Sequence, residues 1–143
     1  MKIYLASRTR HTDKLLKLAE FLIASGHTIT SDWIYVTENL KPFSQNLNRV
    51  KEIADHNLEM MTQSDCLIMF NDPGGTDLFS EFGICLATKK VKNPNMKIYV
   101  IGKFDEATIL QHGTLVEHFE TLDQVLSKKG IVVNNEIKDL KFE

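Results

Sequence analysis

The residue of this sequence whose type and position best suit it to catalysis is Glu81. It follows the apolar run at residues 66–70 and the glycine-rich turn at residues 71–75. An unbroken apolar run predicts a strand that is buried on both faces, and the Pro-Gly-Gly turn ends it. The pattern places Glu81 in the first turn of the next helix, where the helix dipole favours the anion. We therefore expect Glu81 to be ionised near neutral pH and to serve as a nucleophile or base.

The turn before Glu81 contains two glycines, which let backbone N–H groups approach a phosphate or a sugar closely. A turn with purely structural duties carries the same pattern. The sequence has no Walker lysine after the glycines and no G-x-G-x-x-G, which argues against ordinary nucleoside triphosphate and dinucleotide sites. The candidate substrate-binding residues of the turn are Gly74, Gly75, Thr76 and Asp77.

Further polar and aromatic candidates follow the first two predicted strands. Arg8 and Arg10 come after the first strand, where a cation could meet a 5′-phosphate; the alternative is a pair of solvated surface arginines. Trp33 lies near the end of the second strand and could stack on a base, or it could pack in the core or at its rim.

An amide, that of Asn57, falls on the apolar side of a predicted helix over residues 45–63. At 100° per residue, Asn57 lies about 20° from Val50, whereas His56 points away. The amide either hydrogen-bonds the backbone of a loop or contacts a ligand. The apolar stripe of this helix is formed by Leu47, Val50, Ala54, Leu58 and Met61.

These residues must be positioned by alternating strands and helices, which predict parallel βαβ units with right-handed crossovers. We expect a three-layer α/β fold, flavodoxin- or Rossmann-like and doubly wound, with a mainly parallel sheet of about five strands in the order 2-1-3-4-5. In that order the loops at residues 7–12 and 71–77 face each other beside the crevice that Glu81 and Asn57 border. Strands are predicted at residues 2–6, 27–33, 66–70, 97–101 and 116–119, and a capping box begins a further helix at Thr121.

Length and composition bound the molecule as a whole. Residues 1–143 suffice for a single domain, with residues 131–143 forming an edge strand or an interface tail. The net charge of −2 argues against sequence-independent nucleic-acid binding, and no apolar stretch approaches the length of a membrane span. We expect a cytoplasmic protein with a small-molecule ligand and neither a nucleic-acid nor a membrane partner.

The usual metal and nucleophile patterns do not occur. Cys66 and Cys85 lie in apolar contexts without C-x-x-C spacing, which is typical of buried small hydrophobic residues, and the five histidines lack ligand spacing. We therefore expect no metal and no cofactor. No Ser-His-Asp or Cys-His arrangement occurs either. The remaining reaction is attack by one carboxylate on a carbon that can become an oxocarbenium ion, as in glycosyl transfer.

Over roughly residues 1–127 the sequence resembles the nucleoside 2-deoxyribosyltransferase superfamily, which includes the deoxynucleoside and nucleoside 5′-monophosphate N-glycosidases. Four segments carry the resemblance: Lys2-Ile-Tyr-Leu-Ala-Ser7, Ser64-Asp-Cys-Leu-Ile68, Gly74-Gly-Thr-Asp-Leu-Phe-Ser-Glu-Phe-Gly83 and Ile98-Tyr-Val-Ile-Gly102.

The resemblance implies roles for three residues. Glu81 matches the nucleophile that attacks the anomeric carbon and holds a covalent deoxyribosyl intermediate, and Tyr4 matches a tyrosine beside it. Asn57 stands where the family has an aspartate that contacts the sugar or helps protonate the departing base. This is a departure, because an amide cannot act as a general acid.

The resemblance also implies a substrate and an assembly. Ser7, Arg8, Arg10 and Thr76 are available for a 5′-phosphate, and family transferases are homo-oligomers, here a homodimer or larger. The implied function is cleavage or transfer at the N-glycosidic bond of a 2′-deoxynucleoside or its 5′-monophosphate. The alternatives are a non-catalytic module that binds a nucleotide or nucleotide-derived signal in the same crevice, and an interaction protein with a vestigial site.

Overall fold

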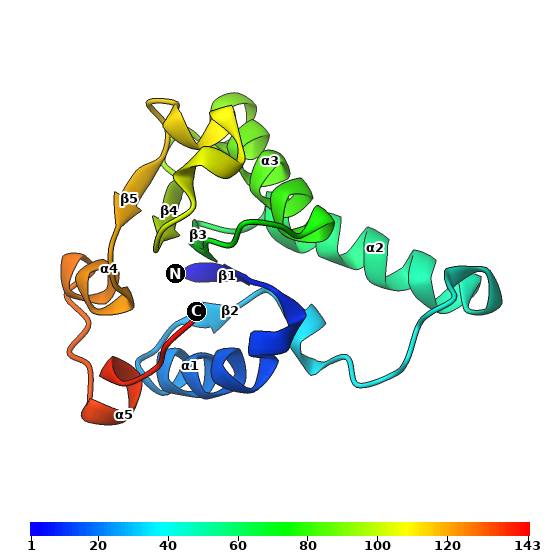
Figure 1. Cartoon of the computed structure of the whole chain (residues 1–143), viewed down its shortest axis with the longest axis horizontal. Coiled ribbons are helices and arrows are strands. Elements are labelled where there is room, and N and C mark those ends of the chain that lie inside the picture. The colour runs from blue at the N-terminus through cyan, green and yellow to red at the C-terminus, as the bar shows by residue number, and fades with distance from the viewer.

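The computed structural model describes residues 1–143, and its strands form one parallel sheet in the order β2-β1-β3-β4-β5 (Figure 1). This confirms the predicted three-layer α/β architecture and its strand order. The strands are β1 (Lys2–Ala6), β2 (Thr28–Ile29), β3 (Cys66–Phe70), β4 (Lys97–Ile101) and β5 (Glu117–Phe119). The helices are α1 (Thr12–Ala24), α2 (Leu47–Thr62), α3 (Thr76–Val91), α4 (Leu122–Lys128) and α5 (Asn135–Lys138).

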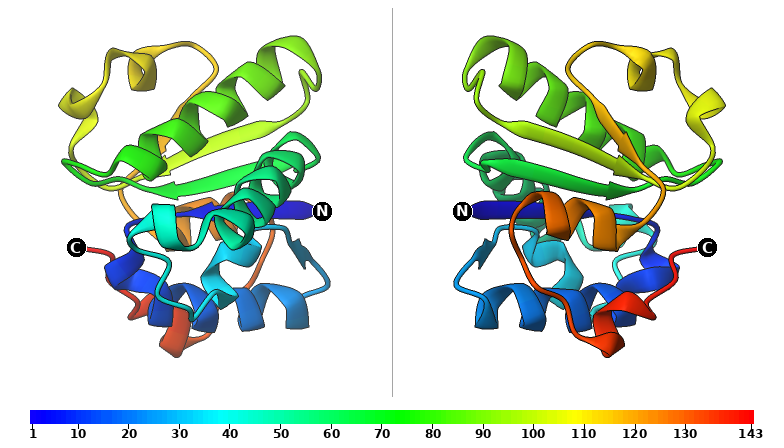
Figure 2. Two further views of the ribbon diagram at one scale, coloured as in Figure 1. Left: turned by 90° about the vertical axis from the view of Figure 1, so that its right-hand side faces the viewer. Right: turned by 90° about the vertical axis from the view of Figure 1, so that its left-hand side faces the viewer.

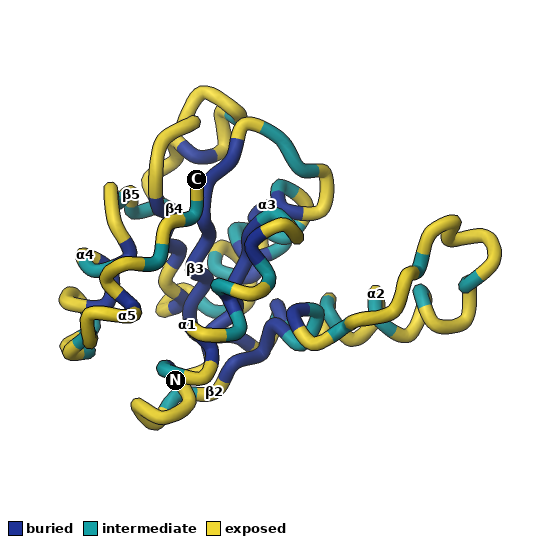
Figure 3. The backbone as a smooth tube through the Cα atoms, turned by 60° about the horizontal axis from the view of Figure 1, so that its bottom comes forward, coloured by how far each residue is buried: buried dark blue, intermediate teal, exposed yellow.

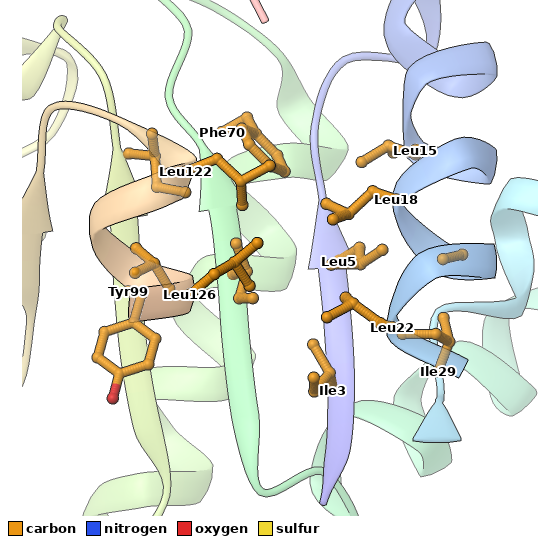
Figure 4. Close-up of a cluster of buried hydrophobic side chains, with 14 of the residues drawn as sticks. Ile3, Leu5, Leu15, Leu18, Leu22, Ile29, Phe70, Tyr99, Leu122 and Leu126 are labelled. Atoms are coloured by element: carbon orange, nitrogen blue, oxygen red, sulfur yellow. The ribbon is translucent and has the colours of Figure 1, made fainter. Parts of the chain in front are cut away.

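The two faces of the sheet carry different helices (Figure 2). Alternate residues of β1 point to opposite faces, so Leu5 packs with α1, α4 and α5, whereas Tyr4 packs with α2 and α3. Every residue of β3 is buried, which explains why its sequence is apolar without alternation. Figure 4 shows the first of these cores, where leucines of α1 and α4 meet the side chains of β1 and β3.

The second strand is shorter than the prediction of residues 27–33. It ends at Ile29, and Trp33 lies in a 3-10 helix, Asp32–Tyr35. Side chains replace the missing backbone pairing: the Leu5 N–H donates to Ser31 Oγ at 3.0 Å, and the Trp33 indole donates to the Leu5 carbonyl at 3.1 Å. Because both backbone groups of Leu5 on this side are satisfied by side chains, the strand stops there.

Helix α2 is where the structure departs most from the predicted apolar stripe. Leu47, Ala54 and Leu58 are exposed, and the first half of the helix, which carries Leu47 and Ala54, projects beyond the sheet (Figure 3). Its inward side carries Ile53, Asn57 and the buried Met61 instead. The prediction that Asn57 faces inward therefore fits the observed side of the helix, whereas three of the five apolar residues predicted beside it do not.

The C-terminal segment does not form the edge strand that the sequence allowed. The sheet edges are β2 and β5, and residues 131–143 contain the short helix α5. The segment packs against the α1 face, and the Phe142 ring lies parallel to the Phe70 ring at 3.6 Å between centroids. No helix has both the length and the apolar character needed to cross a lipid bilayer.

Candidate active site

Glu81 lies in the second turn of α3, not in its first. The helix begins at Thr76 with Gly75 as its N-cap, so Glu81 is five residues beyond the first helical position. The effect of the dipole on a carboxylate falls off within the first turn. Helix α3 packs on the sheet through Leu78, Phe82 and Cys85, and this packing brings the neighbouring Glu81 over β1.

The expectation that Glu81 is ionised at neutral pH is wrong. Burial and, to a lesser extent, the nearby Asp77 carboxylate raise the pKa of its carboxyl from 4.5 to about 8, against the opposing effect of the Tyr4 hydroxyl. A partly buried carboxylate with an acidic neighbour loses hydration without gaining a cation, so the neutral form is favoured. Near pH 7 Glu81 is mainly a carboxylic acid.

The Tyr4 hydroxyl is fully buried and has no hydrogen-bond partner. Burial raises its pKa above the usual range, and the charges of Glu81 and Cys85 act in the same direction. Buried hydroxyls without a partner are uncommon, because losing the hydrogen bonds of water costs free energy. Tyr4 and Glu81 therefore place two polar groups beside the apolar core between the sheet and helices α2 and α3.

Two arginines of the first loop share one carboxylate of the glycine turn. Arg8 Nη1 lies 3.2 Å from Asp72 Oδ1, and Arg10 pairs with the other oxygen of the same group. Burial alone would raise the pKa of Asp72, but the Gly74 N–H and the two guanidinium groups lower it below its usual value. These contacts confirm that the loops after β1 and β3 face each other, and they leave one net positive charge.

The glycine turn is closely covered by Arg8. A Cβ atom on Gly75 would lie 2.7 Å from Arg8 Cδ, and the φ of Gly75 is +122°, so two independent constraints require glycine there. A Cβ on Gly74 would lie 3.3 Å from Arg8 Nη1. The side chain that lies against the glycines is therefore that of an arginine of the same chain.

The remaining candidates occupy different places around this centre. Asn57 is partly buried and makes no side-chain hydrogen bond, so the loop contact considered from sequence is not observed. Ser7 is buried and donates to the Arg8 carbonyl at 3.0 Å. Trp33 is partly buried and packs on both cores, whereas Thr76 and Asp77 are exposed at the start of α3.

Two features of the site were missed from sequence. Asp72, which binds both arginines, was predicted only as part of a turn; its place two residues after a buried strand was the available signal. His56, assigned to the outer side of α2, has Nε2 2.6 Å from Asp32 Oδ2. No spacing pattern could have revealed this pair, because the two residues come from different elements.

A cleft of about 670 Å³ lies at the carboxyl ends of β3 and β4, under the C-terminal segment. Glu81 and Tyr4 do not line it, because they lie on the α2 and α3 face of the sheet, but it shares two residues with the arginine cluster. Its lining includes Arg10, Phe70, Asp72, Ile101, Lys103 and Phe142.

The fold is similar to that of the Clostridium botulinum CMP N-glycosidase BcmB. The similarity covers 92% of this chain and 100% of that one, with a TM-score of 0.58 and 15% sequence identity. At this identity the similarity shows a common fold, in agreement with the fold that the resemblance implied. No protein-family model matches the sequence, and no curated protein sequence matches it.

Proposed function

We propose that this protein cleaves or transfers at the N-glycosidic bond of a 2′-deoxynucleoside or its 5′-monophosphate, with Glu81 as the nucleophile. The observation that carries the proposal is the Glu81 carboxyl held over β1 beside the buried, unpartnered hydroxyl of Tyr4. A carboxylate poised in a water-poor site can attack an anomeric carbon and form a glycosyl ester, which water or an acceptor base then resolves.

Tyr4 and Asn57 hold the nucleophile and the sugar in this proposal. The Tyr4 hydroxyl lies close enough to Glu81 to favour its ionisation, and in this proposal it donates to the carboxylate once the anion forms and orients it. Asn57 is on the inward side of α2, which packs against α3. Its amide can bind a sugar hydroxyl with either its oxygen or its nitrogen. No metal or cofactor is required by these roles.

The arginine cluster favours the 5′-monophosphate over the free nucleoside. Arg8 and Arg10 have side chains that are 40% and 50% exposed, and together they carry one more charge than Asp72 neutralises. An exposed guanidinium can bind a phosphate through two parallel N–H donors. The fold is also that of a CMP N-glycosidase, which supports a nucleotide as the substrate class.

Release of free base from a panel of substrates tests the proposal. The panel comprises deoxynucleosides, their 5′-monophosphates and CMP, each with and without an acceptor base. We expect turnover of at least one monophosphate and a loss of about 10³-fold or more in Glu81→Gln, since the nucleophile is absent. Glu59→Gln, on the exposed side of α2, is the matched control. Turnover that persists in Glu81→Gln contradicts the assigned role.

A non-catalytic binding module is the second candidate, and a specific observation favours it. With Glu81 mainly neutral at pH 7 and an amide at position 57, neither group is in the state that the family chemistry needs. The same panel decides: saturable binding by calorimetry, with no base released from any compound between pH 6 and 9, would establish binding without turnover.

The proposed assembly is a homodimer or larger, with a second copy covering the projecting part of α2. Apolar side chains are about half exposed on α2 and on the segment that precedes it, namely Tyr35, Phe43, Leu47 and Leu58. Contiguous exposed apolar groups mark interaction surfaces, and in this proposal these four form one. Light scattering tests the assembly: Leu47→Asp is expected to yield monomers, and a wild-type monomer at micromolar concentration contradicts it.

A further inference from the structure

His56 and Asp32 form a hydrogen-bonded pair between α2 and the 3-10 helix that follows β2. His56 Nε2 lies 2.6 Å from Asp32 Oδ2, and the two side chains are 47% and 48% exposed. His56 directly precedes Asn57 on α2, and Asp32 begins the 3-10 helix that follows β2. The pair therefore joins the two elements that flank β1 on this side of the sheet.

Asp32 is held firmly with respect to Tyr4. Its two neighbours, Ser31 and Trp33, bond the N–H and the carbonyl of Leu5, which is the residue after Tyr4. Ser31 is fully buried. The Asp32 carboxylate is also close enough to Tyr4 to contribute to the raised pKa of its hydroxyl. Asp32 thus lies near the buried Tyr4 hydroxyl and is fixed to the strand that carries it.

Cleavage of an N-glycosidic bond needs a group that none of the roles above supplies. The departing base accepts an electron pair and leaves more readily when it is protonated. The amide of Asn57 cannot donate a proton to it, and Glu81 is occupied as the nucleophile. A histidine oriented by a carboxylate is a common general acid, and here Asp32 accepts from Nε2 while Nδ1 stays available to a substrate.

We propose that His56, oriented by Asp32, is the general acid that protonates the departing base. This inference rests on the proposed function. In the first step a Glu81 oxygen bonds to C1′, the bond from C1′ to the base nitrogen breaks, and its electron pair stays on the base. The proton on His56 Nδ1 passes to the base, which leaves neutral. In the second step water attacks C1′, neutral His56 accepts its proton, and Glu81 is released as the carboxylate.

Two substrates that differ only in the leaving group separate this role from a structural one. One is the nucleotide turned over best in the panel, and the other is the 4-nitrophenyl glycoside of the same 5′-phosphorylated sugar. Nitrophenolate is stable as an anion and needs no proton, so its departure does not require the acid. Release of base is measured by chromatography and release of nitrophenolate by absorbance.

We expect His56→Gln to lower kcat on the nucleotide about 100-fold and kcat on the nitrophenyl glycoside less than threefold. Asp32→Asn is expected to show the same split at about tenfold on the nucleotide, because the ring loses its orientation. His112→Gln, a histidine bonded to the Asp105 carbonyl away from the site, is the matched control. Circular dichroism checks that each variant is folded.

The outcomes distinguish a failure of the proposed role of His56 from a failure of the proposed function. A similar loss on both substrates, or an unchanged rate on the nucleotide, overturns the role of His56 while leaving the nucleophile in place. Cleavage of the nitrophenyl glycoside but of no nucleotide by the wild-type protein also overturns it, since no acid is then acting. A Glu81→Gln variant that cleaves both substrates at the wild-type rate overturns the proposed function itself.

Discussion

One face of the sheet packs α1, α4 and α5 on seventeen buried apolar residues, whereas the other packs α2 and α3 on eleven and includes the hydroxyl of Tyr4. The larger cluster has no titratable carboxylate within it. The smaller one lies under Glu81, whose pKa is raised to about 8. Groups whose ionisation is disfavoured by their surroundings lower stability, and they concentrate at functional sites. The comparison teaches that the larger apolar core and the carboxyl whose ionisation is disfavoured lie on opposite faces of one sheet.

The largest expected effect on stability comes from the α1 face. Leu18 is fully buried there, and Leu18→Ala should lower the free energy of unfolding by about 2–5 kcal/mol. Val91→Ala, at the exposed C-terminal end of α3, should change it by less than about 0.5 kcal/mol. Urea titration measures both. A comparable loss in the two variants would remove the contrast between the faces, as would a fall in kcat for folded Leu18→Ala.

The next largest effect concerns Glu81, on the α2 and α3 face, whose ionisation should make both activity and stability depend on pH. If the anion of Glu81 attacks, kcat/KM should fall about tenfold for each pH unit below about 8. The free energy of unfolding should change with pH in the opposite direction to kcat/KM. The pKa is raised on folding, so the stability that neutral Glu81 keeps below pH 4.5 is lost as the pH rises through about 8. Glu81→Gln should therefore melt above the wild type by several degrees at pH 9 and by little at pH 4.

The measurements for this prediction are initial rates and thermal melts across pH 4–9. A kcat/KM that stays flat from pH 6 to 8 would show that the carboxylate is already ionised in the free protein. Asp77→Asn provides a second check, because the Asp77 carboxylate contributes to the raised pKa and its removal should move the acidic limb to lower pH.

A smaller effect sharpens the role of the arginine cluster. Arg10→Met should raise KM for a 5′-monophosphate about tenfold and leave KM for the matching nucleoside nearly unchanged, since only the former carries the phosphate. Lys17→Met, an exposed lysine whose ammonium lies 3.9 Å from Glu136, is the control. Equal increases in KM for both substrates would mean that Arg10 supports the loop through Asp72 and does not contact a phosphate.

The smallest effect concerns Asn57. If His56 supplies the proton, Asn57→Asp should change kcat on the nucleotide by less than about threefold, because the new carboxyl duplicates a role already filled. Steady-state kinetics with the best substrate measures it. An increase of tenfold or more would assign the missing acid to position 57 and weaken the case for His56.

The fold could be predicted from sequence because its strands and turns are local signals. The unbroken apolar run of β3, the capping box at Thr121 and the glycine turn each identify an element without knowledge of its neighbours. The stripe on α2 could not be predicted in the same way. Periodicity gives an apolar side, but only the extent of the sheet decides how much of a helix is covered, and the first half of α2 projects beyond it.

The facing of the two loops was predictable from sequence, whereas the electrostatics around Glu81 were not. Topology alone brings the loop after β1 to the loop after β3, and the contacts of Asp72 bear this out. The ionisation of Glu81 depends on burial and on Asp77, and these act through space. The pairing of His56 with Asp32 likewise depends on side-chain directions that a helical wheel assigned to solvent.

The double attachment of the 3-10 helix to Leu5 has a consequence for the cost of reaching a reactive geometry. Ser31 and Trp33 bind both sides of one residue of a central strand, so Asp32 moves with β1 and not with the long loop that follows it. In the proposed reaction, the freedom of the backbone at Asp32 would be lost once, when the chain folds, and not again when a substrate binds. The backbone on both sides of Asp32 is thus fixed to the same strand that α3 contacts.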